Sequence, residues 1–141
     1  MRKTIIVLAL FFSTLISADT LKDENQVEKL AKDVMVHVGK GETVKGLDLM
    51  APYLIIPKSE FETTKNQFAM QAPMLASRFG KTLSSDYVNT EKVGTSLIKI
   101  MYIQKFERHL MYWNFYFYKP KDSWVLNTFR SNDRLELLFN H

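Results

Sequence analysis

The chain has 141 residues, enough for one domain with a sizeable core and too few for two. It contains no cysteine, which excludes disulfides, thiolate metal ligands and thiol nucleophiles. Its formal net charge of +4 is not gathered into a basic stripe, so we expect no nucleic-acid partner. We also expect no cofactor and no metal, because no motif or set of ligands for either occurs in the sequence.

Residues 1–18 have the layout of a secretory signal peptide, with a basic start, an apolar run over residues 5–16 and small residues before Asp19. The run is shorter than the ~20 residues of a membrane-spanning helix, so we expect membrane contact only through this transient leader. An uncleaved membrane anchor is the alternative. Cleavage would leave one domain at residues 19–141, secreted and located in the periplasm, with a charge of about +2 because two basic residues leave with the leader.

Two helices are expected at the start of this domain. The first runs from a cap at Asp23 or Asn25 to about Val38, with apolar residues at three- and four-residue spacing. The run Gly-Lys-Gly at residues 39–41 predicts its end in a left-handed cap, which glycine adopts without a side-chain penalty. A second, shorter helix is expected at residues 44–53, where the following prolines stop it.

A third helix is expected from Ser59, whose oxygen can accept from the first turn, with Glu62 three residues later completing a capping box. Pro73 lies inside this segment and predicts a kink or a split into two short helices, because it removes a backbone donor. Apolar contacts along the helix are expected from Phe61, Phe68, Met70, Met74, Leu75 and Phe79.

Strands follow the helices. β-Branched and aromatic residues are dense at residues 96–106, 109–118 and 124–130, and turn residues separate these segments. A shorter strand is expected at residues 87–93, and a final turn or edge segment at residues 135–139. Helices first and strands afterward predict an α+β domain, with the N-terminal helices packed on one face of a curved antiparallel sheet.

The loop at Glu107 and Arg108 decides which side chains face the helices. If these two residues form the turn, Phe106 lies opposite His109, and side chains alternate between faces outward from there. The inner face then collects almost purely apolar side chains, namely Ile98, Ile100, Tyr102, Phe106, Met111, Trp113, Phe115 and Phe117.

This order of elements resembles the nuclear transport factor 2-like, or cystatin-like, superfamily, and in particular small uncharacterised exported bacterial proteins with that fold. The likeness is carried by the helix at residues 28–38, the segment at residues 47–53, the helix from Ser59 and the closing run WNFYFYKPKDSWVLNTF at residues 113–129. The resemblance implies a cone-like sheet around the helices. Its members include ketosteroid isomerases, polyketide cyclases and dehydratases as well as non-catalytic binding modules, so it implies no single activity.

Candidate pocket residues are those that bring a polar group to the interior. On the inner face these are Tyr102, Trp113 and, near the rim, Gln104. Arg78 and Arg130 are further candidates because a guanidinium matches a carboxylate or phosphate, although Arg78 also suits the negative end of its helix without any ligand.

The face on which Arg130 lies depends on the last hairpin. If Phe117 opposes Trp124, the arginine enters the cone interior. If Tyr118 opposes Trp124, the arginine lies on the outer face, and we favour this register.

An isomerase-type site needs an acid or a histidine in an apolar interior, and none falls on the inner face of the predicted sheet. The helices offer Asp33, His37 and Asp48. Asp33 and His37 are four residues apart, so they form either a proton-transfer pair or, as we favour, a solvated surface pair. They supply two metal ligands without a third. His109 and the terminal His141 are expected to be exposed.

The outer face is amphipathic and tyrosine-rich. Tyrosine and methionine are favoured at protein interfaces, and monomeric proteins seldom expose large apolar patches. We therefore expect this face to bind a second copy, forming a homodimer, or another protein. A wet tyrosine-rich surface and stacking with a flat ligand are the alternatives. The interface candidates are Lys99, Met101, Tyr112, Asn114, Tyr116 and Tyr118.

The sequence thus favours an exported, non-catalytic binding or protein-interaction module that could also take a small apolar ligand. The alternative is a small-molecule isomerase or lyase whose acid–base group comes from the helices or from Tyr102. The interior distinguishes the two. An enzyme needs an open pocket with a titratable group at its floor, whereas an interaction module has its interior filled by side chains.

Overall fold

The computed structural model describes residues 18–139. The predicted signal peptide at residues 1–18 therefore lies almost wholly outside the described residues and stays a prediction, and His141 also lies outside them. Within residues 18–139, no helix combines the length and the apolar character needed to cross a membrane.

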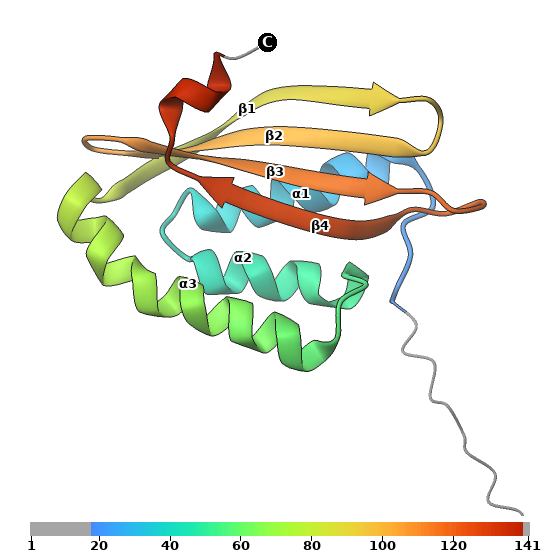
Figure 1. Cartoon of the computed structure of the whole chain (residues 1–141), viewed down its shortest axis with the longest axis horizontal. Coiled ribbons are helices and arrows are strands. Elements are labelled where there is room, and N and C mark those ends of the chain that lie inside the picture. The colour runs from blue at the N-terminus through green and yellow to red at the C-terminus, as the bar shows by residue number, and fades with distance from the viewer. Residues whose placement is uncertain (1–17, 140–141) are drawn as a thin grey trace, which may run out of the picture.

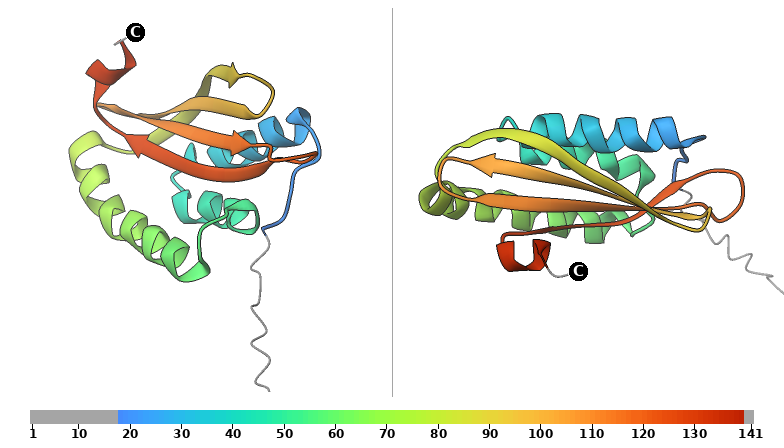
Figure 2. Two further views of the ribbon diagram at one scale, coloured as in Figure 1. Left: turned by 45° about the vertical axis from the view of Figure 1, so that its right-hand side comes forward. Right: turned by 90° about the horizontal axis from the view of Figure 1, so that it is seen from above.

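Three helices precede four strands, which confirms the predicted α+β class. The strands form one antiparallel sheet in the order β1-β2-β3-β4, and the helices lie against one of its faces (Figure 1). Figure 2 shows the sheet twisting over the helices as an open layer. In chain order the elements are α1 (Glu24–Val38), α2 (Thr43–Met50), the 3-10 turn η1 (Ala51–Tyr53), α3 (Lys58–Phe79), β1 (Thr82–Val93), β2 (Leu97–Phe106), β3 (Leu110–Tyr118), β4 (Val125–Asn132) and the 3-10 turn η2 (Leu135–Leu138).

The first helix follows its sequence pattern closely. The Asp23 carboxylate caps α1 by accepting a hydrogen bond from the backbone N of Gln26 at 2.9 Å. Within the Gly-Lys-Gly run the second glycine is the left-handed one, because Gly39 stays helical with φ −66° while Gly41 has φ +79°. The buried stripe is the expected one, with Val27, Leu30, Ala31, Val34, Met35 and Val38.

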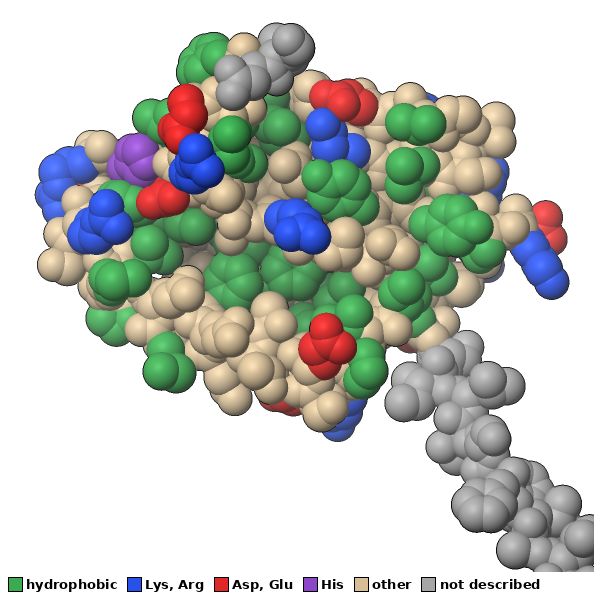
Figure 3. Space-filling model, viewed as in Figure 1, with side chains coloured by type: hydrophobic (Ala, Val, Ile, Leu, Met, Phe, Trp, Pro, Cys, Tyr) green, Lys and Arg blue, Asp and Glu red, His purple; other side chains and the backbone are tan. Residues whose placement is uncertain are grey.

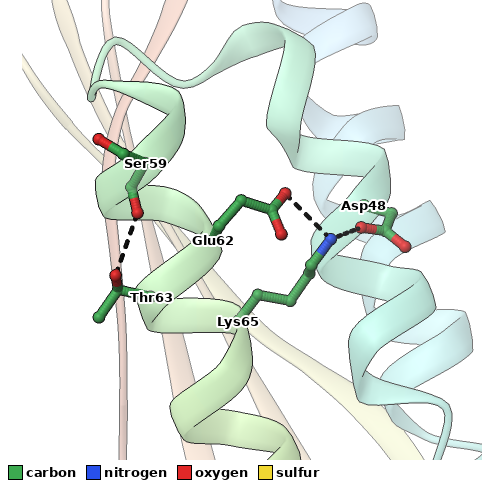
Figure 4. A network of polar contacts seen from close by, with 5 residues as sticks. All are labelled: Asp48, Ser59, Glu62, Thr63 and Lys65. Carbon is green, nitrogen blue, oxygen red and sulfur yellow. Dashed lines mark hydrogen bonds and ion pairs between the residues drawn. The ribbon is translucent and has the colours of Figure 1, made fainter.

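The start of α3 corrects the predicted capping box. The helix begins directly after Pro57, whose extended ψ of 143° ends the preceding loop, and no side chain caps it. Ser59 is already inside the helix, where its carbonyl accepts from the Thr63 hydroxyl at 3.1 Å (Figure 4). The Glu62 carboxylate instead pairs with the Lys65 amine at 3.2 Å.

Pro73 does not split the third helix. α3 is continuous over 22 residues and curves as a single ribbon in Figures 1 and 2. The proline leaves the carbonyl of Ala69 without its helical partner, and Ala69 is exposed, so water can satisfy it. The expected apolar contacts of Met70 and Met74 are also wrong, since Met70 is 80% exposed and Met74 points largely to solvent.

The central hairpin has the predicted register. Phe106 donates its backbone N–H to the carbonyl of His109 at 2.9 Å, and Tyr102 lies opposite Trp113. The predicted inner face is buried throughout β2 and β3. β1 is longer than expected, because Thr82, Ser84, Ser85 and Asp86 also pair with β2, with an irregularity at Leu83 between Thr82 and Ser84.

The last hairpin has neither register considered from the sequence. Both registers placed Trp124 opposite β3, but its backbone exchanges hydrogen bonds with Leu21 at 2.7 and 2.8 Å. β4 then starts with Val125 opposite Tyr118, and a one-residue irregularity further along brings Arg130 opposite Asn114. Arg130 is therefore exposed on the outer face, as the favoured register required, although with a different partner.

The core lies between the inner face of the sheet and the first two helices. α1 and α2 approach closely because Gly46 has no side chain. A Cβ there would lie 2.8 Å from the carbonyl oxygen of Val34. The largest fully buried side chains are Trp113, Phe115, Phe117, Met35, Leu47 and Met50.

Candidate functional site

The third helix buries only its two ends. Within α3, Phe61 and Phe79 are the buried side chains, and between them Phe68 and Leu75 are partly buried against the core. Figure 3 shows apolar side chains gathered along the hollow between the sheet and α3. A cavity of about 400 Å³ occupies part of this space, bounded by α3, by the inner face of β2 and β3, and by the loops before α2 and β1.

The side chains of α3 explain why the cavity exists. Residues 68, 72, 75 and 76 line it, and this spacing places them along one stripe of the helix. Two of the four are alanines, Ala72 and Ala76, which are too small to reach the sheet. Phe68 and Leu75 are the larger members of the stripe. We call this set the α3 stripe.

The floor of the cavity is polar but uncharged. Gln104 is 4% exposed and is the only polar side chain classed as buried within residues 18–139. Its Oε1 accepts from the indole N–H of Trp113 at 3.1 Å, and its Nε2 donates to the Thr82 hydroxyl at 3.2 Å and to the Val38 carbonyl at 3.5 Å. A buried amide needs such partners, and side chains and backbone of the protein supply them to Gln104.

The ionisable groups of the cavity lie at its rim. Of the residues that line it, Lys40 and Lys81 carry the charged side chains, and both are exposed. Within the described part of the chain, neither amine forms an ion pair. Glu42 lies near Lys40, but the pKa of its carboxyl is lowered mainly by a hydrogen bond from Lys45. No acid or histidine belongs to the wall.

Tyr102 faces a different space from Trp113, although the two are paired across the hairpin. A broader cavity of about 750 Å³ lies between α1 and β1, and Tyr102 and Tyr87 line it with their ring centres 5.5 Å apart. Burial raises the pKa of the Tyr102 phenol above its ordinary value. The phenol therefore stays protonated at neutral pH and cannot serve as a base.

The two arginine candidates contribute to neither cavity. Arg78 is exposed at the end of α3, with its guanidinium 5.3 Å from the ring centre of Phe79. Arg130 lies on the outer face opposite Asn114. Of the five pocket candidates from the sequence, Trp113 and Gln104 line the cavity beneath α3.

The acidic and histidine candidates of the helices do not form a proton-transfer pair. Asp33 pairs with Lys29 along α1 rather than with His37. Asp48 pairs with the Lys65 amine of α3 at 2.8 Å, which ties α2 to α3 (Figure 4). These contacts favour the interpretation of Asp33 as a solvated surface residue. Within residues 18–139, no group of three or more metal-binding side chains comes together.

The interface candidates are only partly exposed. Tyr112 is buried within the chain, and the Lys99 amine pairs with Glu91 at 2.9 Å. Met101, Asn114 and Tyr116 are half-buried. At one end of the sheet, three exposed apolar residues are cross-strand partners and lie in a row that we call the corner row: Val93, Leu97 and Tyr118, 69%, 37% and 43% exposed.

The sequence interpretation missed the α3 stripe and the rim lysines. The sequence predicts apolar contacts for Phe68 and Leu75, but not that Ala72 and Ala76 lie beside them along a cavity. Gln104 was noted near the rim of the inner face, and the structure instead buries it at the floor of the cavity.

Comparison with known proteins adds one distant similarity. No family model matches the chain, and no curated protein matches it. Among solved structures, a DUF4783 family protein from Bacteroides uniformis is similar at 15% identity over 72% of this chain and 94% of that chain, with a TM-score of 0.46. At that TM-score the similarity carries no inference about function. It also does not test the resemblance to the nuclear transport factor 2-like superfamily.

Proposed function

We propose that this protein is an exported, non-catalytic binding module that holds a small, largely apolar molecule beneath α3. The cavity of about 400 Å³ is the observation that supports the proposal. Its volume falls within the roughly 300–1,000 Å³ of ligand sites, and like them it is walled mostly by apolar side chains with few polar groups. Export rests on the leader at residues 1–18, and the cone-like superfamily remains part of the same proposal.

The make-up of the cavity favours binding over the isomerase or lyase alternative. Such an enzyme must move a proton at the reacting carbon, with an acid or base within hydrogen-bond reach. The floor offers the amide of Gln104 and the indole of Trp113, and neither group exchanges a proton usefully at neutral pH. Tyr102 is protonated and lines the other cavity.

Binding of a neutral fluorescent probe tests the proposal. N-phenyl-1-naphthylamine should bind with one-to-one saturation and accept excitation energy from Trp113. Ala72→Phe should fill the space and weaken binding at least tenfold. Met74→Phe is the matched control, because it adds the same ring on the solvent side of the same helix. Equal binding by the folded Ala72→Phe variant and the wild type would count against the cavity as the site.

We propose self-association as a second candidate function, on the strength of the corner row. β1 is an edge strand, and the row begins on it with Val93. Edge strands with nearby apolar side chains favour pairing with another chain, and a second copy would bring two such rows together.

Solution mass measured by light scattering tests this second candidate. Leu97→Glu should convert a homodimer to monomer, as should Tyr116→Glu if the contact extends along β3. Lys121→Glu, outside the sheet, is the control. A monomeric wild type at high concentration would eliminate the candidate.

A further inference from the structure

We propose that the ligand is a single-chain anionic amphiphile, with its anionic group at the rim and its chain along the α3 stripe as far as Phe68. This inference rests on the proposed function, because it specifies what the cavity beneath α3 binds. It assigns three roles: Lys40 and Lys81 recognise the charge, the two alanines accommodate the chain, and Phe68 limits its length.

The interior of the cavity excludes a polar head group. Both hydrogen-bonding ends of the Gln104 amide are occupied, and the Trp113 indole donates to that amide. A head group placed against Gln104 and Trp113 would lose its water without gaining a partner from either side chain, which is costly. The polar end of any ligand must therefore stay at the rim.

The rim selects the sign of the head group. Lys40 and Lys81 are the charged residues of the wall, and both are exposed. Two acids, Glu42 and Glu107, lie beside these lysines, and neither lines the cavity. Glu42 binds Lys45, and the Glu107 carboxylate accepts from the backbone N of Lys81 at 3.0 Å. A carboxylate or a similar anion thus meets two cations without a competing acid in the wall.

The stripe fixes the shape of the apolar part. From residue 68 to residue 76 the helix axis advances about 12 Å. A linear chain of roughly ten carbons covers that distance with ordinary single-bond lengths. Ala72 and Ala76 leave room along this path, and Met111 and Phe106 face them from the sheet.

Phe68 closes the inner end of the path. Its ring stacks on Trp113 with centres 5.4 Å apart and lies 6.1 Å from the ring of Phe129. On the far side of the same ring is a second cavity of about 370 Å³, which Phe68, Phe129 and Leu54 help to line. The ring of Phe68 therefore separates two spaces, and it limits how long a chain the first space can hold.

A head-group series tests the charge assignment. Decanoate, decanol and decyltrimethylammonium share one chain, and each is titrated by calorimetry below its micelle concentration. Decanoate should bind roughly three- to tenfold tighter than decanol, and the cation should bind weakest. In the double variant Lys40→Gln/Lys81→Gln, the affinity for decanoate should fall to that for decanol. The affinity for decanol itself should be the same as in the wild type. Lys22→Gln/Lys121→Gln, which removes two charges elsewhere, should keep the preference.

A chain-length series tests the role of Phe68. From hexanoate to decanoate, affinity should rise roughly fourfold per methylene. It should stop rising before hexadecanoate in the wild type but continue rising in Phe68→Ala. Phe68→Leu provides a milder version if the alanine variant fails to fold, and Met70→Ala on the exposed side of α3 should behave as the wild type.

The outcomes separate this inference from the proposed function. Equal binding of decanoate and decanol overturns the anionic class while the cavity still binds. An identical chain-length limit in the wild type and in folded Phe68 variants overturns the length assignment. Failure of every probe, including the neutral naphthylamine, overturns the proposed function itself.

Discussion

At the scale of single residues, Gln104 connects the core to the cavity. It satisfies the indole N–H of Trp113 from one end of its amide and ties β2 to Thr82 of β1 from the other. A buried amide with all its partners fixes the orientation of a neighbouring ring, whereas an incomplete network is destabilising. Gln104 therefore has a structural role that can be measured apart from any ligand.

Replacing Gln104 should expose that role. Gln104→Leu leaves the buried Trp113 N–H without an acceptor and should lower the free energy of unfolding by about 1–3 kcal/mol. The double variant Gln104→Leu/Trp113→Phe removes both partners and should recover part of the loss. Urea denaturation measures both effects. The hydrogen bond between Gln104 and Trp113 contributes little if Gln104→Leu is as stable as the wild type. The same conclusion follows if the free energy lost by the double variant is the sum of the losses of the two single variants.

Tyr102 should make stability depend on alkaline pH. Burial raises the pKa of its phenol in the folded state above the unfolded value of 10.0, so the folded chain holds this proton more tightly. Stability linked to Tyr102 is present below pH 10 and is lost as pH rises through the folded pKa. Urea midpoints between pH 9 and pH 11 should therefore fall more steeply for the wild type than for Tyr102→Phe. The other tyrosines are present in both proteins, so equal slopes would contradict the assignment.

At the scale of elements, α3 differs from the rest of the fold. It is the longest helix, yet it is buried only at Phe61 and Phe79 and is tied to α2 through the Lys65–Asp48 ion pair. Elements with few buried contacts open locally before the whole molecule unfolds. A helix that opens in this way also gives a ligand access to the space beneath it.

The rates of amide hydrogen exchange should therefore differ between the elements. Amides in the middle of α3 should exchange by local opening, whereas those of β2 and β3 should require global unfolding. Lys65→Gln should speed exchange in α3 and leave the central hairpin unchanged, because it cuts the tie to Asp48. Lys29→Gln breaks an ion pair within α1 alone and serves as the control. Uniform exchange across α3, β2 and β3 would contradict local opening.

At the scale of the whole molecule, sequence patterns predicted those parts of the fold that depend on interactions between residues close in the sequence. The stripe of α1 and the alternation around the turn at Glu107 and Arg108 depend on neighbouring residues, and both are confirmed. The register of β4 depends on Leu21, which exchanges backbone hydrogen bonds with Trp124 although it lies more than a hundred positions away in the sequence. No short-range pattern contains that information.

The cavity escaped prediction for a related reason. Its existence depends on how α3 packs against the sheet, which involves contacts between residues far apart in the sequence, such as Phe68 with Trp113 and Phe129. The small side chains of Ala72 and Ala76 indicate a cavity only when the position of α3 relative to the sheet is known. Trp113 could be placed on the inner face by counting, but neither the empty space beside it nor the lysines at the rim could be derived that way.

The bridge between Leu21 and Trp124 has a consequence for how the chain becomes a folded protein. Leu21 and Trp124 are more than a hundred positions apart and form an antiparallel bridge, so this contact can form only after the intervening helices and strands have brought the two segments together. Contacts between positions so far apart in the sequence form late in folding, so the start of β4 should become ordered after the central hairpin of β2 and β3.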